Sequence, residues 1–265
     1  MKLHDRQAVA NILTRSVRQG AITQAGCVPA DFAVQGERMP YVVRRLLVHG
    51  DQPSSVHVQE LLDSLKIARR VCPELADATG CDVLRAPKVI TQEGCAALRR
   101  AVDIERSTAK DSVDRAAEHQ RNVTAIELGQ LIGVEVVQRL WQLPIEFHIG
   151  QIFQRVEHFR VEAFIRRYSI DTRPWNGFHK DSAAVTVNVA LADDVAHGGG
   201  RLLAVFDGAV QHILRHEGEA TVHTSTLLHA VTSMTWGVRY SLILFFHHVG
   251  PGASKDADDS TTPST

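Results

Sequence analysis

The chain has 265 residues, of which 44% are hydrophobic and 22% are charged, and its formal net charge is −1. This balance predicts a globular protein with one large domain, or one domain plus an appendage. It argues against nucleic acid as the main partner, because no block of like charge is present. No signal peptide and no apolar run of about 18 residues is visible, so we expect a cytoplasmic protein that does not enter the membrane.

The first third of the chain has the pattern of helices. The stretch "SSVHVQELLDSLKIARRV" places Val58, Leu61, Leu62 and Leu65 at helical spacing, behind a serine pair that can cap a helix. We therefore expect residues 1–85 to form a helical N-terminal extension. Three roles are open for it, because it could cover an active-site mouth, support dimerisation or only add to the core.

The part of the chain that follows is predicted to form a short strand and then two helices. Val89 and Ile90 form a short apolar run, and Thr91 is placed to cap a helix through "AALRRAVD". Thr124 and Glu127 then have the spacing of a capping box. The helix that they begin covers "TAIELGQLIGVEVVQRLW" and is expected to stop near Pro144.

From about Val161 the apolar period changes from helical to two. Short β-branched or aromatic runs follow one another in "VEAFIRRYSI", "AVTVNVAL", "RLLAVF", "EATVHT" and "VRYSLILFF". Loops rich in Gly and Asp separate them, and no helical segment lies between. The pattern predicts an antiparallel sandwich or barrel. The polar tail, residues 250–265, is predicted to be disordered.

Two polar side chains stand before one of these strands. His179 and Asp181 are two residues apart, a spacing that places both side chains on one face of extended backbone, with about 6.6–7 Å between their Cα atoms. An imidazole and a carboxylate that converge in this way suit a divalent metal, and a second histidine would complete the facial triad typical of iron(II). His229 is the candidate, because Arg239 follows it by ten residues on a long strand; His223, in "TVHTST", is the weaker alternative.

The order of these features resembles the iron(II)- and 2-oxoglutarate-dependent dioxygenases of the prolyl and lysyl hydroxylase type. The features that match are "HKD", the strand "TVNVAL", the turn "HGGGRLL", the run "LLHAV" and the strand "GVRYSLILFF". The resemblance spans about residues 86–249. It implies an α+β fold with a double-stranded β-helix (jelly-roll) core, buttressing helices and a dioxygenase domain at 86–249.

The resemblance also implies a role for each site residue. His179, Asp181 and His229 match the catalytic iron(II) ligands. Arg239 matches the basic residue that pairs with the distal carboxylate of 2-oxoglutarate, which a guanidinium binds in a two-point fork. Ser241, on the same strand face, can add a hydroxyl to that carboxylate.

Three further residues are expected at the co-substrate. Tyr168, on the preceding strand, matches a tyrosine that often forms a hydrogen bond with 2-oxoglutarate in this family. Thr186 and Asn188 are polar and share one face of an otherwise apolar strand. We therefore expect them to line the cavity near the co-substrate.

The activity implied is oxidation of an unactivated C–H bond with O2, which converts 2-oxoglutarate to succinate and CO2, and ascorbate is a candidate reductant. The absence of targeting signals favours an amino acid or related small molecule as substrate; a peptidyl lysine or proline is the alternative. Asp181 argues against halogenation, because related halogenases have a small residue there. Two other readings are a zinc hydrolase, which would have no need of Arg239, and a catalytically silent jelly-roll module that binds a metabolite.

Several polar residues have simpler interpretations. Arg166, Arg167 and Arg173 are expected on a solvated face, with contact of one of them to a substrate carboxylate as the alternative. The segment "HILRHEGE" is expected at a solvated edge. Trp175 and Asn176 are placed in a loop at the cavity mouth, where they could contact substrate or only pack. The "HGGG" turn precedes a strand rather than a helix, which excludes a phosphate-binding loop. The four cysteines lack CxxC spacing and indicate thiols rather than disulfides or zinc.

Overall fold

The structure is a computed structural model that describes residues 28–66, 83–112, 114–146 and 159–249. Expectations about the polar tail, about residues 1–27 and about a helix continuing past residue 66 lie outside these ranges. Cys95 is the one cysteine within them, and it is a buried free thiol. No helix in the described ranges is both long and apolar enough to cross a bilayer.

Two antiparallel sheets form the core, with strands that switch between them along the chain. The larger sheet has the order β1-β9-β5-β12-β3-β2 and the smaller has the order β4-β10-β7-β8. The strands of the larger sheet are β1 (Leu84–Ala86), β2 (Gln120–Val123), β3 (Phe159–Ser169), β5 (Val185–Ala190), β9 (Ala220–Thr224) and β12 (Val238–His248). Those of the smaller sheet are β4 (Asn176–His179), β7 (Leu202–Phe206), β8 (Ala209–Ile213) and β10 (Leu228–Val231). A two-stranded ribbon joins β6 (Gly198–Gly199) to β11 (Met234–Trp236).

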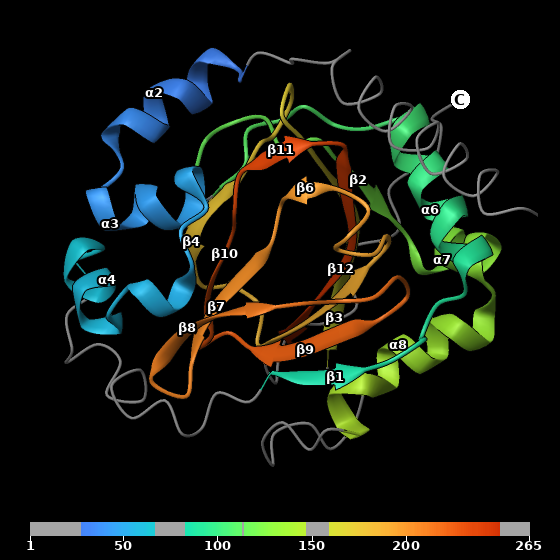
Figure 1. Cartoon of the computed structure of the whole chain (residues 1–265). Coiled ribbons are helices and arrows are strands. Elements are labelled where there is room, and N and C mark those ends of the chain that lie inside the picture. Colours follow the sequence, from blue (N-terminus) through green and yellow to red (C-terminus); the bar gives the residue numbers. More distant parts are fainter. Residues whose placement is uncertain (1–27, 67–82, 113, 147–158, 250–265) are drawn as a thin grey trace, which may run out of the picture.

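Three helices cover the outer face of the larger sheet: α6 (Gln92–Ile104), α7 (Ala125–Ile132) and α8 (Val134–Glu146) (Figure 1). The strand alternation explains this packing. Val185, Val187 and Val189 of β5 belong to the buried cluster that includes Leu98 and Leu140 of the helices. The residues between them, which include Thr186, face the other way, toward the smaller sheet.

The N-terminal helical segments cover the outer face of the smaller sheet, on the opposite side of the molecule from α6–α8 (Figure 1). They are α2 (Ala30–Arg38), α3 (Tyr41–Arg44), the π-helical turn η1 (Arg45–His49), the 3-10 turn η2 (Pro53–Ser55) and α4 (Val58–Ser64). Leu46 and Leu61 form one buried cluster with Leu203, Val205 and Leu228 of the sheet. This segment therefore contributes core to the jelly roll.

The helix starts are predicted well by their caps. The Thr91 side chain accepts a hydrogen bond from the backbone N–H of Gly94 at 3.2 Å, and the predicted capping box is confirmed, with both hydrogen bonds between Thr124 and Glu127 present. The serine pair does not cap α4, because it lies in the preceding 3-10 turn and α4 begins at Val58.

Two further local predictions are wrong. Val89 and Ile90 form a bend rather than a strand, because both backbone N–H groups donate to the Gly218 carbonyl at 2.8 and 3.3 Å. The helix predicted from Thr124 is two helices, α7 and α8, because Gly133 adopts a φ of +92° and breaks the first. The expected stop near Pro144 agrees with the structure, in which α8 ends at Glu146.

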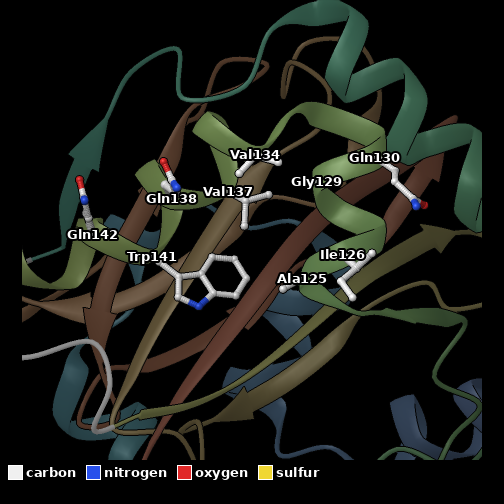
Figure 2. A pocket seen from close by; sticks show the side chains of 9 residues that line it. All are labelled: Ala125, Ile126, Gly129, Gln130, Val134, Val137, Gln138, Trp141 and Gln142. Atoms are coloured by element: carbon white, nitrogen blue, oxygen red, sulfur yellow. The ribbon is translucent and has the colours of Figure 1, made fainter.

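An apolar groove of about 730 Å³ lies on the helical side, along α7 and α8 (Figure 2). Trp141 and Val137 of α8 face it together with Ala125 and Ile126 of α7. None of its lining residues lines the cavity between the two sheets.

The "HGGG" turn depends on Gly199. Its φ is +67°, and a Cβ there would lie 1.8 Å from the Ser233 backbone oxygen. Gly208 has a similar φ of +68° but has no atom within 4 Å of such a Cβ. We expect Gly208→Ala to cost roughly 1–2 kcal/mol of backbone strain, and Gly199→Ala to cost roughly 1–3 kcal/mol more, because it adds a clash. Urea unfolding followed by circular dichroism measures both, and equal losses would contradict the assigned clash.

Candidate metal centre

The structure brings His179, Asp181 and His229 together between the two sheets. His179 ends β4 and lies directly opposite His229 of β10, with ring centroids 4.3 Å apart. The Oδ1 atom of Asp181, two residues beyond β4, lies 3.6 Å from the Nε2 atom of each histidine. One possible ligand atom from each residue lies within 4.8 Å of the other two. Three candidate ligands, from two adjacent strands and one loop, therefore converge on a single position.

Each histidine ring is oriented by a hydrogen bond from its Nδ1 atom, as is common for histidines that bind metals. The Nδ1 of His179 donates to the Gly177 carbonyl at 2.8 Å, and the Nδ1 of His229 donates to the Leu227 carbonyl at 3.2 Å. A carbonyl can only accept, so each proton sits on Nδ1 and each Nε2 lone pair is free for a metal. Burial and the adjacent His179 lower the pKa of His229 to about 3, which keeps its imidazole neutral at physiological pH.

The Asp181 carboxylate is oriented by a hydrogen bond to its Oδ2 atom. The Thr186 hydroxyl donates to Oδ2 at 2.6 Å, which leaves Oδ1 facing the two histidines. Burial raises the pKa of Asp181, but the neighbouring imidazoles outweigh that effect and lower it well below its usual range, so the carboxylate stays charged. Thr186 thus orients a candidate ligand, which is a more direct role than lining the cavity.

His223 lies beside this group rather than in it. Its Nε2 is 3.7 Å from Oδ2 of Asp181, and its ring centroid is 5.0 Å from that of His229. It projects from β9 opposite Thr186, whereas His179 and His229 share the smaller sheet. The choice of His229 over His223 therefore agrees with the position of the three converging side chains.

An incompletely satisfied guanidinium lines the same cavity. Arg239 of β12 is 2% exposed and lies over the ring of Tyr168, its neighbour on β3, at 4.8 Å. Its Nε and Nη2 atoms and the Ser241 hydroxyl have no hydrogen-bond partner among the described residues. A buried charge left unpaired in this way is costly, and a ligand carboxylate would satisfy it in two-point geometry.

Asn188 lines this cavity too, and its partner was not expected from the sequence. Arg215 Nη1 donates to Asn188 Oδ1 at 3.0 Å. Arg215 is only 2% exposed, so the expectation that "HILRHEGE" forms a solvated edge is wrong for this residue. The cause is Asp194, whose carboxylate accepts a hydrogen bond from the Arg215 backbone N–H at 3.1 Å and draws the segment inward.

The arginines before the His179 motif also differ from expectation. Arg166 and Arg173 are buried rather than solvated, because each pairs with an aspartate at 2.8 Å (Asp111) and 2.7 Å (Asp114) respectively. Arg167 is the partly exposed member of the three and pairs with an exposed aspartate on α6.

Trp175 and Asn176 have different positions. Trp175 is buried, and its ring packs edge-on against Phe32 of α2 at 5.1 Å. Asn176 belongs to β4 rather than to a loop, lines the cavity, and accepts a hydrogen bond from Arg173 at 3.1 Å. Of the two, only Asn176 lines the cavity.

These residues fit a divalent metal with a bound dicarboxylate. Two imidazole nitrogens and one carboxylate oxygen leave open positions on an ion that prefers six ligands. The buried donors of Arg239 and Ser241 line or adjoin the same cavity and match an acceptor at the other end of a short molecule.

Comparison with solved structures identifies the fold. A prolyl-4-hydroxylase from Pseudomonas putida superposes with a TM-score of 0.51 and 16% identity, over 67% of this chain and 99% of its own. A viral collagen prolyl hydroxylase from Paramecium Bursaria Chlorella virus-1 gives a TM-score of 0.43 and 15% identity, over 66% and 98%. EvdO2 from Micromonospora carbonacea var. aurantiaca, solved with 2-oxoglutarate, gives 0.47 and 15%, over 69% and 91%.

Sequence comparisons give no further match: no family model and no curated protein matches the chain. The similarity to the Pseudomonas putida structure therefore carries the conclusion, and it concerns the fold. Together with the two antiparallel sheets and their flanking helices, it confirms the architecture predicted from the sequence. The chain has an α+β jelly-roll fold, which it shares with the Pseudomonas putida prolyl-4-hydroxylase.

Proposed function

We propose that the chain is an iron(II)- and 2-oxoglutarate-dependent oxygenase that hydroxylates an unactivated C–H bond of an amino acid or related small molecule. The observation that carries the proposal is one cavity that is lined both by His179, Asp181 and His229 and by buried Arg239, two of whose nitrogens have no hydrogen-bond partner among the described residues. A zinc hydrolase would use the three ligands and leave Arg239 without a purpose.

Each residue has a defined task in this proposal. His179, Asp181 and His229 hold iron(II), and Arg239 and Ser241 bind the distal carboxylate of 2-oxoglutarate. Bound iron with 2-oxoglutarate and O2 supplies the oxidation, in which the co-substrate becomes succinate and CO2 and the substrate C–H becomes C–OH. The Nδ1 hydrogen bonds of the histidines fix the ligand orientation.

The substrate is proposed to approach through a wider cleft of about 730 Å³ that shares Phe164, Arg166 and Phe245 with the metal cavity. Its remaining lining is rich in amides, hydroxyls and carboxylates, such as those of Asn122 and Glu118. Such a surface favours a polar substrate over an apolar one. This supports an amino-acid-like molecule.

Anaerobic addition of iron(II) and 2-oxoglutarate tests the proposal. We expect a weak visible charge-transfer band that requires both additions, followed on admission of O2 by succinate formation that a suitable amino acid accelerates, with ascorbate present as reductant. The control replaces iron(II) with zinc, which should give neither band nor succinate. A protein that stays colourless while it hydrolyses a substrate with zinc would contradict the proposal, and one that binds both ligands yet makes no succinate with any substrate would be a binding module.

A further inference from the structure

A second buried guanidinium contacts a residue that lines the same cavity. Arg215 follows β8 and is 2% exposed. Its partners are Asn188 Oδ1, at 3.0 Å from Nη1, and Asp194 Oδ1, at 3.5 Å from Nη2. Its Nε has no hydrogen-bond partner among the described residues.

The charges in this region do not balance. Arg215 and Arg239 are both buried, and Asp194 is the one carboxylate in the described ranges that pairs with either. Burial and then the positive charge of Arg239 lower the pKa of Arg215 to about 10, so it remains charged at neutral pH beside a like charge. Burial and Arg239 also lower the pKa of His197 to about 4, so this buried neighbour of Asp194 is neutral. Among the three buried groups Arg215, Arg239 and Asp194, two positive charges and one negative charge leave an excess of one positive charge, which a single ligand carboxylate would neutralise.

Asn188 connects Arg215 to the cavity. A guanidinium can only donate, so the Asn188 atom that faces Arg215 must be the carbonyl oxygen. The amide nitrogen is then the polar atom left over, and Asn188 lines the cavity together with Arg239. Arg215 therefore determines that this position offers a hydrogen-bond donor, and not an acceptor, to whatever occupies the cavity.

We propose that Arg215 is a positioning residue that determines co-substrate specificity: it turns the Asn188 amide nitrogen toward the ligand and supplies the second positive charge, so that the cavity selects a 2-oxo dicarboxylate over a 2-oxo acid with an uncharged end. The inference rests on the proposed function. It differs from a purely structural ion pair with Asp194 in what it predicts. A structural role would weaken the binding of all 2-oxo acids alike, whereas a specificity role acts on the distal carboxylate alone.

The test compares two ligands on protein loaded with Mn(II). 2-Oxoglutarate and 2-oxopentanoate share a five-carbon chain, and 2-oxopentanoate has a methyl group in place of the distal carboxylate. We expect Arg215→Gln to raise the dissociation constant of 2-oxoglutarate about tenfold or more and to change that of 2-oxopentanoate less than about twofold, as measured by calorimetry. Arg215→Lys keeps the charge and should recover part of the selectivity. Arg201→Gln is the matched control, because Arg201 donates to the Asp194 backbone oxygen outside the cavity lining.

Each outcome decides a separate point. A wild-type protein that binds Mn(II) but neither 2-oxo acid overturns the proposed function and this inference together. A wild-type protein that prefers 2-oxoglutarate, with Arg215→Gln weakening both ligands equally or neither, overturns this inference alone. Circular dichroism and Mn(II) affinity report whether the variant is folded. If Arg215→Gln does not fold, Asn188→Ala replaces it, and unchanged selectivity in that variant overturns the inference equally.

Discussion

Asp181→Ala is expected to raise the dissociation constant for Mn(II) at least about a hundredfold, because a lost ligand should cost no less than the 10–100-fold that loss of an outer-shell partner costs. Asp181 supplies the one negative charge among the three converging side chains, and its Oδ1 is 3.6 Å from both histidine Nε2 atoms. Without it, only the two imidazoles remain. Calorimetric titration measures the affinity directly. A thermal melt gives a second measure, since bound metal should raise the melting temperature of the wild type and not that of the variant.

Asp207→Asn is the control for a change in surface charge. Asp207 is an exposed carboxylate in the turn after β7, with a φ of +51° that asparagine tolerates well. This variant should bind Mn(II) as the wild type does. If Asp181→Ala also bound Mn(II) normally, the ion would occupy a different place, and the assignment of His179 and His229 as ligands would be wrong.

Arg239→Gln is expected to raise the dissociation constant of 2-oxoglutarate about a hundredfold or more and to leave Mn(II) affinity unchanged. A hydrogen bond to a charged group contributes about 1.5–3 kcal/mol, and each 1.4 kcal/mol is a factor of ten, so the loss of a two-point carboxylate contact has an effect of this size. Glutamine fills much of the buried volume over Tyr168 but carries no charge. The co-substrate titration of the iron(II) protein under anaerobic conditions, followed by the visible band, measures the shift.

Arg167→Gln provides the comparison on a neighbouring strand. Arg167 lies opposite Tyr240 in the β3–β12 pairing, and its side chain is outside the cavity lining. We expect its co-substrate affinity to equal that of the wild type. If Arg239→Gln lost Mn(II) instead of 2-oxoglutarate, Arg239 would stabilise the metal position and would not serve as the carboxylate anchor.

The features that the sequence predicts are those written in local patterns. The alternation in "AVTVNVAL" assigns Val185 and Val187 to one face and Thr186 to the other, and the structure has the same division. The capping residues Thr91 and Thr124 fix two helix starts through contacts only three residues away. The candidate ligands are recognisable because His179 and Asp181 are close in sequence and His229 follows in a fixed order of strands.

The features that the sequence does not predict depend on distant partners. Arg215 is buried because it contacts Asp194 and Asn188, which lie 21 and 27 residues earlier in the sequence. No spacing in "HILRHEGE" indicates either contact. The burial of Arg173 likewise depends on Asp114, 59 residues away. The break at Gly133 shows the converse limit. Apolar residues continue at helical spacing across Gly133, so the hydrophobic pattern predicts one continuous helix. The backbone conformation of Gly133 instead ends α7, and a second helix begins after it.

The two faces of the smaller sheet make different contacts. Its inner face carries His179 and His229, and its outer face is covered by residues 42–62, with Leu46 and Leu61 fully buried. The Ser233 backbone N–H, just after β10, also donates to the Leu47 carbonyl at 2.6 Å. If the N-terminal helices packed less tightly on this face, the strands that position two of the three candidate ligands would become more mobile. The affinity for a metal ion therefore depends on the packing of these helices.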